Sequence, residues 1–264
     1  MYKTFYGFTD LPFSKEIKQE HIFQGHYLKE LLSRLDYIKK HRGMMLVTGE
    51  PGVGKTTALR FWLGGLRDET FFKVYIPLST VGITDFYNQL NDKLNGEYAS
   101  TKSRLFKAIQ ARILELATHQ NRIPVIVIDE SHLLRNENFF ELQIIMNFKM
   151  DSFDPAIFIL LSQTHLNNRL QRSSLKSFSQ RISMKYHIQQ PGFSEIKEYI
   201  AFNLKLNGAA PNIFTDPAYK AIFNISQGIL RTTGKLVIKT LTFGAMHKKP
   251  SLSEDDVLIA SKEL

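Results

Sequence analysis

The residues best suited to chemistry lie together in the stretch Gly49–Thr57, which reads Gly-Glu-Pro-Gly-Val-Gly-Lys-Thr-Thr and fits the pattern G-x-x-x-x-G-K-[ST]. Glycines in such a loop adopt backbone angles barred to other residues, so successive N–H groups can point inward at phosphate oxygens. On this interpretation Lys55 contacts the β and γ phosphates of a nucleotide, and the Thr56 hydroxyl is a ligand of Mg²⁺. The predicted nucleotide-binding residues are Gly49, Glu50, Pro51, Gly52, Val53, Gly54, Lys55, Thr56 and Thr57.

The flanking segments position this loop. An apolar run, Met44–Val47, precedes it and indicates a strand, and Thr56–Leu66 follows with the pattern of a helix. The N-terminus of that helix adds the positive end of its dipole beneath a bound phosphate. An incidental glycine-rich turn is the alternative, and the strand and helix around the motif make it the weaker one.

A second group of polar residues follows the apolar run that begins at Val125 and ends in Asp129 and Glu130. Such an unbroken run is typical of a strand buried on both faces of a parallel sheet. We predict that Asp129 completes the Mg²⁺ shell and that Glu130 polarises the water that attacks the γ-phosphate. The alternative, a solvated turn starting at Asp-Glu, is weakened by the phosphate-binding motif. The nearby His132 is predicted to be a structural hydrogen-bonding residue.

Gln163 follows another apolar run, Ala156–Leu161, expected beside the strand that ends at Asp129. We predict that its side chain holds the attacking water or senses the γ-phosphate. A polar residue that merely ends a strand is the alternative.

Four arginines are further candidates. Arg169, Arg172 and Arg181 follow the predicted sheet, and a cation that reaches a neighbouring subunit's nucleotide would stabilise transition-state charge. We assign this role to Arg181 and expect Arg169 and Arg172 to be solvated surface residues. Arg231 opens a later helix, from which it is predicted to reach the phosphates, with a first-turn surface arginine as the alternative.

The order of elements predicts an α/β protein with a parallel sheet covered by helices on both faces, followed by a small all-α domain. We place the boundary near Gln190-Pro191-Gly192, which gives domains 1–190 and 191–264. The predicted strands are Met44–Val47, Phe71–Ile76, Val125–Ile128, Ala156–Leu161 and Gln180–Ile188. The predicted helices are Gln24–Lys40, Thr56–Leu66, Thr84–Leu94, Ser103–His119, Ser194–Leu206, Asp216–Ser226, Arg231–Met246 and Ser253–Leu264.

Composition narrows the function further. The chain of 264 residues carries a formal charge of +9, which predicts a polyanionic partner, either nucleic acid or an anionic membrane surface. It has no cysteine, which excludes disulfides, cysteine zinc sites and thiol nucleophiles. No apolar run is long enough for a membrane span and no signal-peptide core begins the chain, so we expect a cytoplasmic protein. The candidate DNA-contacting residues share one predicted helix: Lys102, Arg104, Lys107 and Arg112.

Together these motifs resemble an AAA+ ATPase, with Walker A at Gly49–Thr56 and Walker B at Val125–Glu130. Gln163 matches the sensor 1 position, Arg181 lies in a Q-R-I segment like the arginine finger, and Arg231 matches a G-x-x-R sensor 2 before a helical lid. The resemblance implies ATP and Mg²⁺ as cofactors.

More narrowly, the chain resembles the ExeA-like group, through its opening Phe5-Tyr-Gly-Phe8 and Pro12-Phe13 and the segment from Gln163 to Leu166. Ser162 and Thr164 replace the Gly and Pro of that segment. Arg231-Thr-Thr-Gly-Lys235 departs from the group's R-L-x-N stretch, which weakens the assignment of Arg231.

Two kinds of protein share this core. One is the secretion ATPase, which has a membrane span and a peptidoglycan-binding part after the ATPase; the other is the transposon-encoded ATPase of the TniB, TnsC, IstB and MuB type. The basic charge and the end at Leu264 without a span favour the second kind. This resemblance implies ATP-dependent, largely sequence-independent binding to double-stranded DNA, a homo-oligomeric ring or helical filament, a transposase partner and no membrane. The alternatives are an ExeA-type secretion or envelope-assembly ATPase, a non-catalytic nucleotide switch and a helicase-loader-like ATPase.

Overall fold

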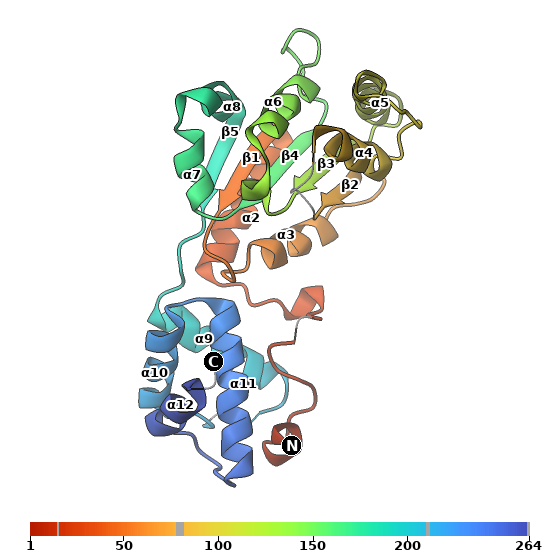
Figure 1. Ribbon diagram of the computed structural model, residues 1–264. Helices are drawn as coiled ribbons and strands as arrows, with labels where there is room; N and C mark the ends of the chain where they lie inside the picture. The colour runs from red at the N-terminus through yellow and green to blue at the C-terminus, as the bar shows by residue number, and fades with distance from the viewer. Residues whose placement is uncertain (15, 78–81, 210–211, 263–264) are drawn as a thin grey trace. The chain divides into compact units, whose positions relative to one another are not determined.

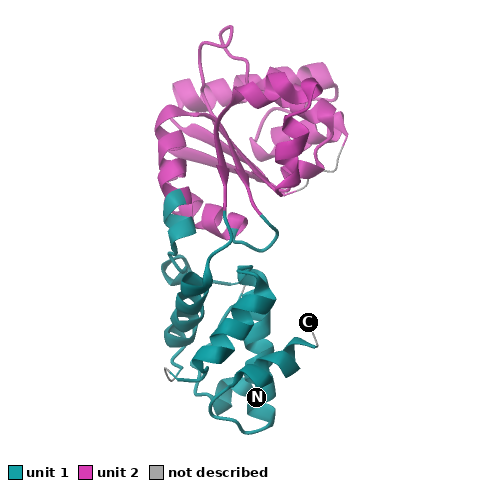
Figure 2. Cartoon of the chain, turned by 90° about the vertical axis from the view of Figure 1, so that its left-hand side faces the viewer, with its two compact units in different colours: residues 1–30, 50–54, 189–264 teal, residues 31–49, 55–188 magenta. Residues whose placement is uncertain are grey.

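The computed structural model describes residues 1–14, 16–77, 82–209 and 212–262. They form two compact units, shown in different colours in Figure 2. Unit 1 comprises residues 1–30, 50–54 and 189–264, and unit 2 comprises residues 31–49 and 55–188. The long helix α2 (His26–His41) runs from one unit into the other.

Unit 2 is built on a five-stranded sheet of order β2-β3-β4-β1-β5 (Figure 1). All of its strand pairs are parallel, so the carboxyl ends of the strands lie along one edge. The strands are β1 (Gly43–Thr48), β2 (Phe71–Ile76), β3 (Ile123–Ile128), β4 (Ile157–Ser162) and β5 (Ile182–His187). The predicted adjacency of the strands before Asp129 and Gln163 is confirmed, since β3 pairs with β4.

Helices cover both faces of the sheet because its central strands are apolar on both sides. Alternate residues such as Met44, Ile126 and Phe158 belong to one large buried core shared with the helices on that face. The intervening residues, such as Met45 and Val127, are equally buried on the other face. The helices of unit 2 besides α2 are α3 (Lys55–Gly64), α4 (Ile83–Lys93), α5 (Lys102–Leu114), α6 (Asn136–Ile145), α7 (His165–Leu170) and α8 (Lys176–Arg181).

Two elements of unit 2 change type within their predicted bounds. The predicted strand Gln180–Ile188 begins later, because Gln180 and Arg181 end helix α8 and β5 starts at Ile182. The predicted helix Ser103–His119 is α-helical only to Leu114 and continues as a wider π-helical turn, Glu115–His119.

Unit 1 contains α1 (Tyr2–Phe5) and four longer helices: α9 (Phe193–Leu206), α10 (Asp216–Ser226), α11 (Leu230–Met246) and α12 (Glu254–Ser261). The last corresponds to the predicted helix Ser253–Leu264, whose final two residues lie outside the described ranges. Ser253 and Asp256 form a capping box at its start.

The N-terminal segment belongs to unit 1, which differs from the predicted domain 1–190. Thr9 N–H donates to the carbonyl of Asn207 at 2.8 Å, and the Tyr6 hydroxyl donates to the carbonyl of Lys249, also at 2.8 Å. The ring of Phe13 lies edge-on to Tyr199 on α9. Aromatic packing on the C-terminal helices therefore determines where this segment lies, rather than its position in the sequence.

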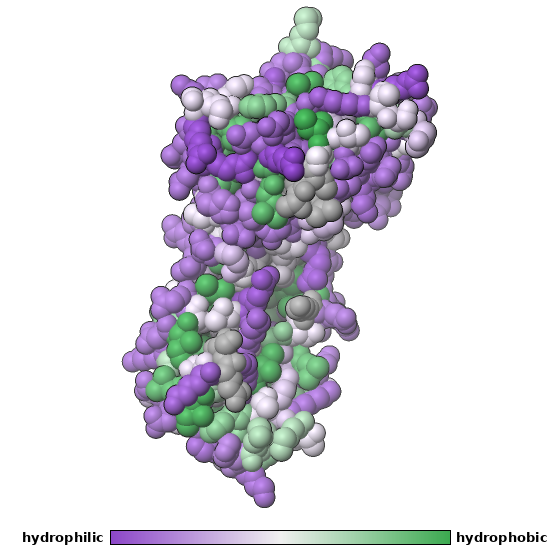
Figure 3. Space-filling model, viewed as in Figure 1, coloured by the Kyte–Doolittle hydropathy of each residue, from purple (hydrophilic) through white to green (hydrophobic). Residues whose placement is uncertain are grey.

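Two surface properties bear on partners. Among the helices of the described ranges, none combines the length and the apolar character needed to cross a membrane. The face seen in Figure 3 mixes hydrophilic and hydrophobic side chains on both units. On α6, Phe140 and Ile144 are 37% and 50% exposed.

Candidate functional site

The loop that follows β1 has a backbone that only glycine tolerates at two positions. Gly52 and Gly54 have φ values of +88° and +100°. A Cβ atom added at Gly52 would lie 2.9 Å from the Cβ of Arg231, because the N–H of Arg231 donates to the Gly52 carbonyl at 3.1 Å. A side chain at Gly52 would therefore displace either the loop or the first turn of α11.

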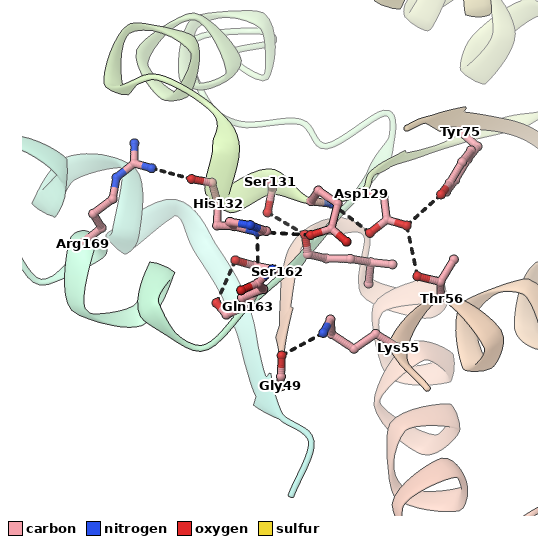
Figure 4. A network of polar contacts seen from close by, with 12 residues as sticks. Gly49, Lys55, Thr56, Tyr75, Asp129, Ser131, His132, Ser162, Gln163 and Arg169 are labelled. Atoms are coloured by element: carbon pink, nitrogen blue, oxygen red, sulfur yellow. Dashed lines mark hydrogen bonds and ion pairs between the residues drawn. The ribbon is translucent and has the colours of Figure 1, made fainter. Parts of the chain in front are cut away.

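Lys55 is the first residue of α3 and its side chain is buried. Its ammonium donates to the carbonyl of Gly49 at 2.7 Å, as Figure 4 shows. The cation is thus folded back over the start of the loop, where its charge acts on any anion that the loop amides hold.

Thr56 and Asp129, far apart in the sequence, meet at the carboxyl end of β3. The Thr56 hydroxyl donates to Oδ2 of Asp129 at 3.0 Å, and the N–H of Glu130 donates to Oδ1 at 2.8 Å. The Tyr75 hydroxyl also donates to Oδ2, at 2.7 Å. Asp129 is only 6% exposed, so these hydrogen bonds compensate for the burial of its carboxylate.

Glu130 leaves the strand in a left-handed conformation, with φ +48° and ψ +36°. Its side chain is 48% exposed, with Oε2 at 3.4 Å from Nδ1 of the buried His132. Burial lowers the pKa of the His132 imidazole, an effect that the nearby Glu130 carboxylate opposes. The N–H of Gln163 approaches the same Nδ1 at 3.5 Å, so His132 lies between Glu130 and the residue that follows β4.

Arg169 is a correction to the sequence analysis, which expected a solvated surface residue. Its guanidinium, carried by α7, donates to the carbonyls of His132 and Leu134 at 2.7 Å each and to Oδ1 of Asn136 at 2.8 Å. It also lies over the ring of Phe139, 5.2 Å from the centroid. Arg169 therefore holds the turn that follows Glu130.

Arg181 lies away from these residues, at the end of α8. Its Nη1 is 2.6 Å from Oδ1 of Asp151, and the Arg181 side chain is 21% exposed. The role of Arg181 as an arginine finger toward a neighbouring subunit stays a prediction. In that role Arg181 would have to leave Asp151 and contact the neighbour's nucleotide instead.

The remaining predicted residues are placed as follows. The Arg231 backbone contacts the loop residue Gly52, and Arg231 itself is an exposed residue at the start of α11. On α5, Lys102 pairs with Glu141 at 2.5 Å and Arg112 with Glu115 at 2.9 Å.

The other two candidate DNA-contacting residues, Arg104 and Lys107, are exposed on α5. Within the described part of the chain neither makes an ion pair. Of the four predicted DNA contacts, these two are therefore the better placed for a phosphate backbone.

The arrangement fits a nucleotide with Mg²⁺. The hydroxyl of Thr56 and the carboxylate of Asp129 are hard oxygen donors 3.0 Å apart, the ligand type that Mg²⁺ prefers. Because the Thr56 hydroxyl donates its hydrogen bond to Asp129, the lone pairs of its oxygen can face a cation. The residues that would hold the nucleotide phosphates are the loop amides and Lys55.

Two positions near the site were not predicted to matter. Tyr75 was interpreted only as part of a strand and Arg169 only as surface, yet each donates hydrogen bonds beside Asp129 or Glu130. Neither belongs to a local sequence motif. The feature of the sequence that could have indicated a role for Arg169 is its position six residues after Gln163, on the helix that follows β4.

Comparison with known proteins agrees with this geometry. The family model described as AAA domain matches residues 38–170, just over half of the chain. The chain belongs to the AAA domain family. It is also 26% identical over 267 residues to General secretion pathway protein A of Aeromonas hydrophila, a match that covers 100% of this chain and 48% of that protein. This AAA domain chain therefore spans about half the length of that relative.

Solved structures share the fold. Cdc6p from Pyrobaculum aerophilum superposes with a TM-score of 0.68 at 16% identity, covering 99% of this chain and 70% of that one. The Aeropyrum pernix ORC1 protein, solved in complex with DNA, gives 0.64 at 13% identity, with 91% and 66% covered. These findings confirm the predicted P-loop AAA+ fold and support an AAA+ ATPase of the ExeA-like group. The transposon-encoded branch stays a prediction.

Proposed function

We propose that this chain binds ATP with Mg²⁺ and hydrolyses it to ADP and phosphate. The observation that carries the proposal is the contact between Thr56 and Asp129, which joins the phosphate loop to the acidic end of β3. Thr56 and Asp129 would hold the Mg²⁺, which when bound would supply charge neutralisation on the phosphate oxygens. Lys55 adds a second positive charge, and Glu130, half-exposed beside His132, orients and polarises the attacking water.

Phosphate release and nucleotide binding, measured separately, test this step. Glu130→Gln is expected to abolish phosphate release while ATP binding persists, and Lys55→Ala is expected to weaken binding itself. Glu137→Gln is the matched control, because Glu137 is an exposed acid on the neighbouring α6. Undiminished hydrolysis by the Glu130→Gln variant contradicts the assignment. Tight binding without any hydrolysis by the wild-type chain supports a nucleotide switch instead.

We further propose that the ATP-bound form assembles on double-stranded DNA and regulates transposition by recruiting or activating a transposase. The formal charge of +9 and the exposed Arg104 and Lys107 on α5 support a phosphate backbone as partner. A protein of the same fold, ORC1, has been solved in complex with DNA. The transposase rests on the sequence resemblance to the TniB, TnsC, IstB and MuB type.

DNA binding should be measured without nucleotide, with ADP and with a non-hydrolysable ATP analogue, with electron microscopy of the same samples. We expect ordered assemblies on duplex DNA only with the ATP analogue, and none with Lys55→Ala. Affinity should fall steeply with added salt, because phosphate contacts release counterions. A flat salt response contradicts phosphate contact.

A pair of double variants locates the DNA-binding surface. Replacing Arg104 and Lys107 with Ala should weaken DNA binding and lower the salt slope by about two. Replacing the exposed Lys220 and Lys262 of unit 1 with Ala removes the same charge and serves as the control. Equal losses in both double variants would show that only net charge matters.

A second candidate function is favoured by the match along the whole chain to General secretion pathway protein A. In this alternative the chain is an ATPase whose partner is another protein, and ATP governs that interaction. Indifference to DNA in every nucleotide state, together with intact hydrolysis, would favour this candidate over the transposition regulator.

A further inference from the structure

Tyr75 lies on β2, the edge strand of the sheet, and faces the opposite way from the core residues Val74 and Ile76. Lys73, two residues earlier on the same face, donates to the carbonyls of Leu63, in the last turn of α3, and Leu66, just after it. Tyr75 is therefore on the side of the sheet that α3 covers, close to the start of that helix.

The hydroxyl of Tyr75 contacts the carboxylate that closes the neighbouring strand. It donates to Oδ2 of Asp129 at 2.7 Å, while the Thr56 hydroxyl donates to the same oxygen at 3.0 Å. The N–H of Glu130 donates to Oδ1 at 2.8 Å. Hydrogen bonds on both oxygens restrict rotation of the Asp129 carboxylate, and Figure 4 shows the Tyr75 and Thr56 hydroxyls beside it.

We propose that Tyr75 is a positioning residue that orients the Asp129 carboxylate for Mg²⁺ held with a nucleotide. This inference rests on the proposed function, since it needs a nucleotide site at Lys55 and Thr56. Thr56 is itself a predicted metal ligand, so when Mg²⁺ is bound its hydroxyl serves both the cation and Asp129. Tyr75 also donates to Oδ2 and is not itself a predicted metal ligand. Removing a residue that hydrogen-bonds to a metal ligand in this way typically lowers the affinity for the metal by about 10–100-fold.

Tyr75→Phe removes one oxygen atom and tests the proposal directly. The matched control is Tyr87→Phe, because Tyr87 also donates to a carboxylate at 2.7 Å, that of Glu141, on the face of the sheet away from Asp129. The probe is a fluorescent ADP analogue, titrated into each protein in EDTA and in a series of Mg²⁺ concentrations. Thermal unfolding of both variants reports any general destabilisation.

We expect equal affinity for the probe in EDTA for wild type and both variants. The Mg²⁺ midpoint is the concentration that gives half of the metal-dependent increase in affinity for the probe. It should rise about tenfold in Tyr75→Phe and stay unchanged in Tyr87→Phe. An unchanged Mg²⁺ midpoint in Tyr75→Phe overturns the inference. A lower midpoint does so as well, because it would mean that Tyr75 competes with the cation for Asp129.

Failure of the proposed function gives a different result. Wild-type protein that binds no probe in EDTA or in Mg²⁺ overturns the nucleotide site and the role of Tyr75 with it. Wild-type protein that binds the probe with no gain from Mg²⁺ overturns the metal assignment of Thr56 and Asp129.

Discussion

Replacing Arg169 with Ala should loosen the turn that carries Glu130. The guanidinium donates three hydrogen bonds to this turn, two of them to the main-chain carbonyls of His132 and Leu134. After the substitution those carbonyls lose a charged donor, and the loop from His132 to Asn136 is held by fewer contacts, among them its own short helical turn.

The size of the effect follows from these contacts. Hydrogen bonds from a charged donor contribute about 1.5–3 kcal/mol when fully buried, but Arg169 is only half-buried, so we take about 1 kcal/mol for each. The position over Phe139 adds roughly 0.5 kcal/mol. Water can replace part of the lost hydrogen bonding, so we expect the free energy of unfolding to fall by about 2–3 kcal/mol.

Urea unfolding of Arg169→Ala, Arg169→Lys and Arg172→Ala measures this. Arg172 is an exposed arginine just past the end of α7, and its removal should change the free energy of unfolding by less than about 0.5 kcal/mol. Lysine keeps the charge but lacks the planar fork, so Arg169→Lys should lie between the other two.

ATP hydrolysis by the same variants is measured at temperatures well below unfolding. It distinguishes an effect of Arg169 on catalysis from its effect on stability. Because Glu130 shares the turn with His132, kcat should fall several-fold in Arg169→Ala while nucleotide affinity is retained. The reasoning is refuted if Arg169→Ala is as stable as Arg172→Ala and hydrolyses ATP at the same rate.

Three further predictions concern other parts of the chain. Asp256→Asn should destabilise the protein by about 1–2 kcal/mol at neutral pH. Burial alone would raise the pKa of Asp256, but hydrogen bonds from Lys249 and from the helix cap at Ser253 outweigh burial and hold that pKa below its ordinary value. This stabilisation is complete above about pH 4 and is lost as pH falls through the folded pKa, so unfolding curves of wild type and variant should converge in acid. Arg181→Ala should leave nucleotide binding intact but lower ATPase activity at high protein concentration by at least tenfold, and an equal loss in dilute protein would contradict a role toward a neighbouring subunit. Gly52→Ala should weaken nucleotide binding at least tenfold, measured by titration, because its φ of +88° is strained for alanine and the added Cβ would meet Arg231.

The three central strands β1, β3 and β4 were predictable because each is a short, continuous apolar run, buried on both faces as parallel strands are. The residues at their carboxyl ends followed from the same pattern. Asp129 and Gln163 lie on neighbouring strands because β3 pairs with β4, and Thr56 reaches Asp129 because the phosphate loop returns the chain to that edge.

Helix α6 was not predicted, and its composition explains why. Its buried residues include Asn138 and Glu141 as well as apolar ones, which removes the contrast between a polar and an apolar face. Glu141 is buried because Tyr87 and Lys102, from two other helices, donate to its oxygens. Such compensation depends on tertiary contacts and has no periodic signature in the sequence.

Tyr75 and Arg169 were missed for a related reason. Tyr75 meets a carboxylate 54 positions later in the chain, and two of the three acceptors of Arg169 are main-chain carbonyls. Main-chain acceptors carry no residue identity, so no pattern of side chains could indicate that Arg169 holds a turn. Only the three-dimensional fold shows that the Arg169 guanidinium makes these hydrogen bonds and is not a solvated surface charge.

These two contacts separate the functions of the adjacent acids. Asp129 is held from the edge strand by Tyr75 and from α3 by Thr56, whereas the turn after Glu130 is held from α7 by Arg169. Tyr75 and Thr56 donate to the Asp129 carboxylate itself, whereas Arg169 donates to main-chain carbonyls beyond Glu130, and the two acids are linked by the Glu130 N–H, which donates to Oδ1 of Asp129. Binding of the metal and activation of water are thus expected to respond to different substitutions, both outside the sequence motifs that identify the site.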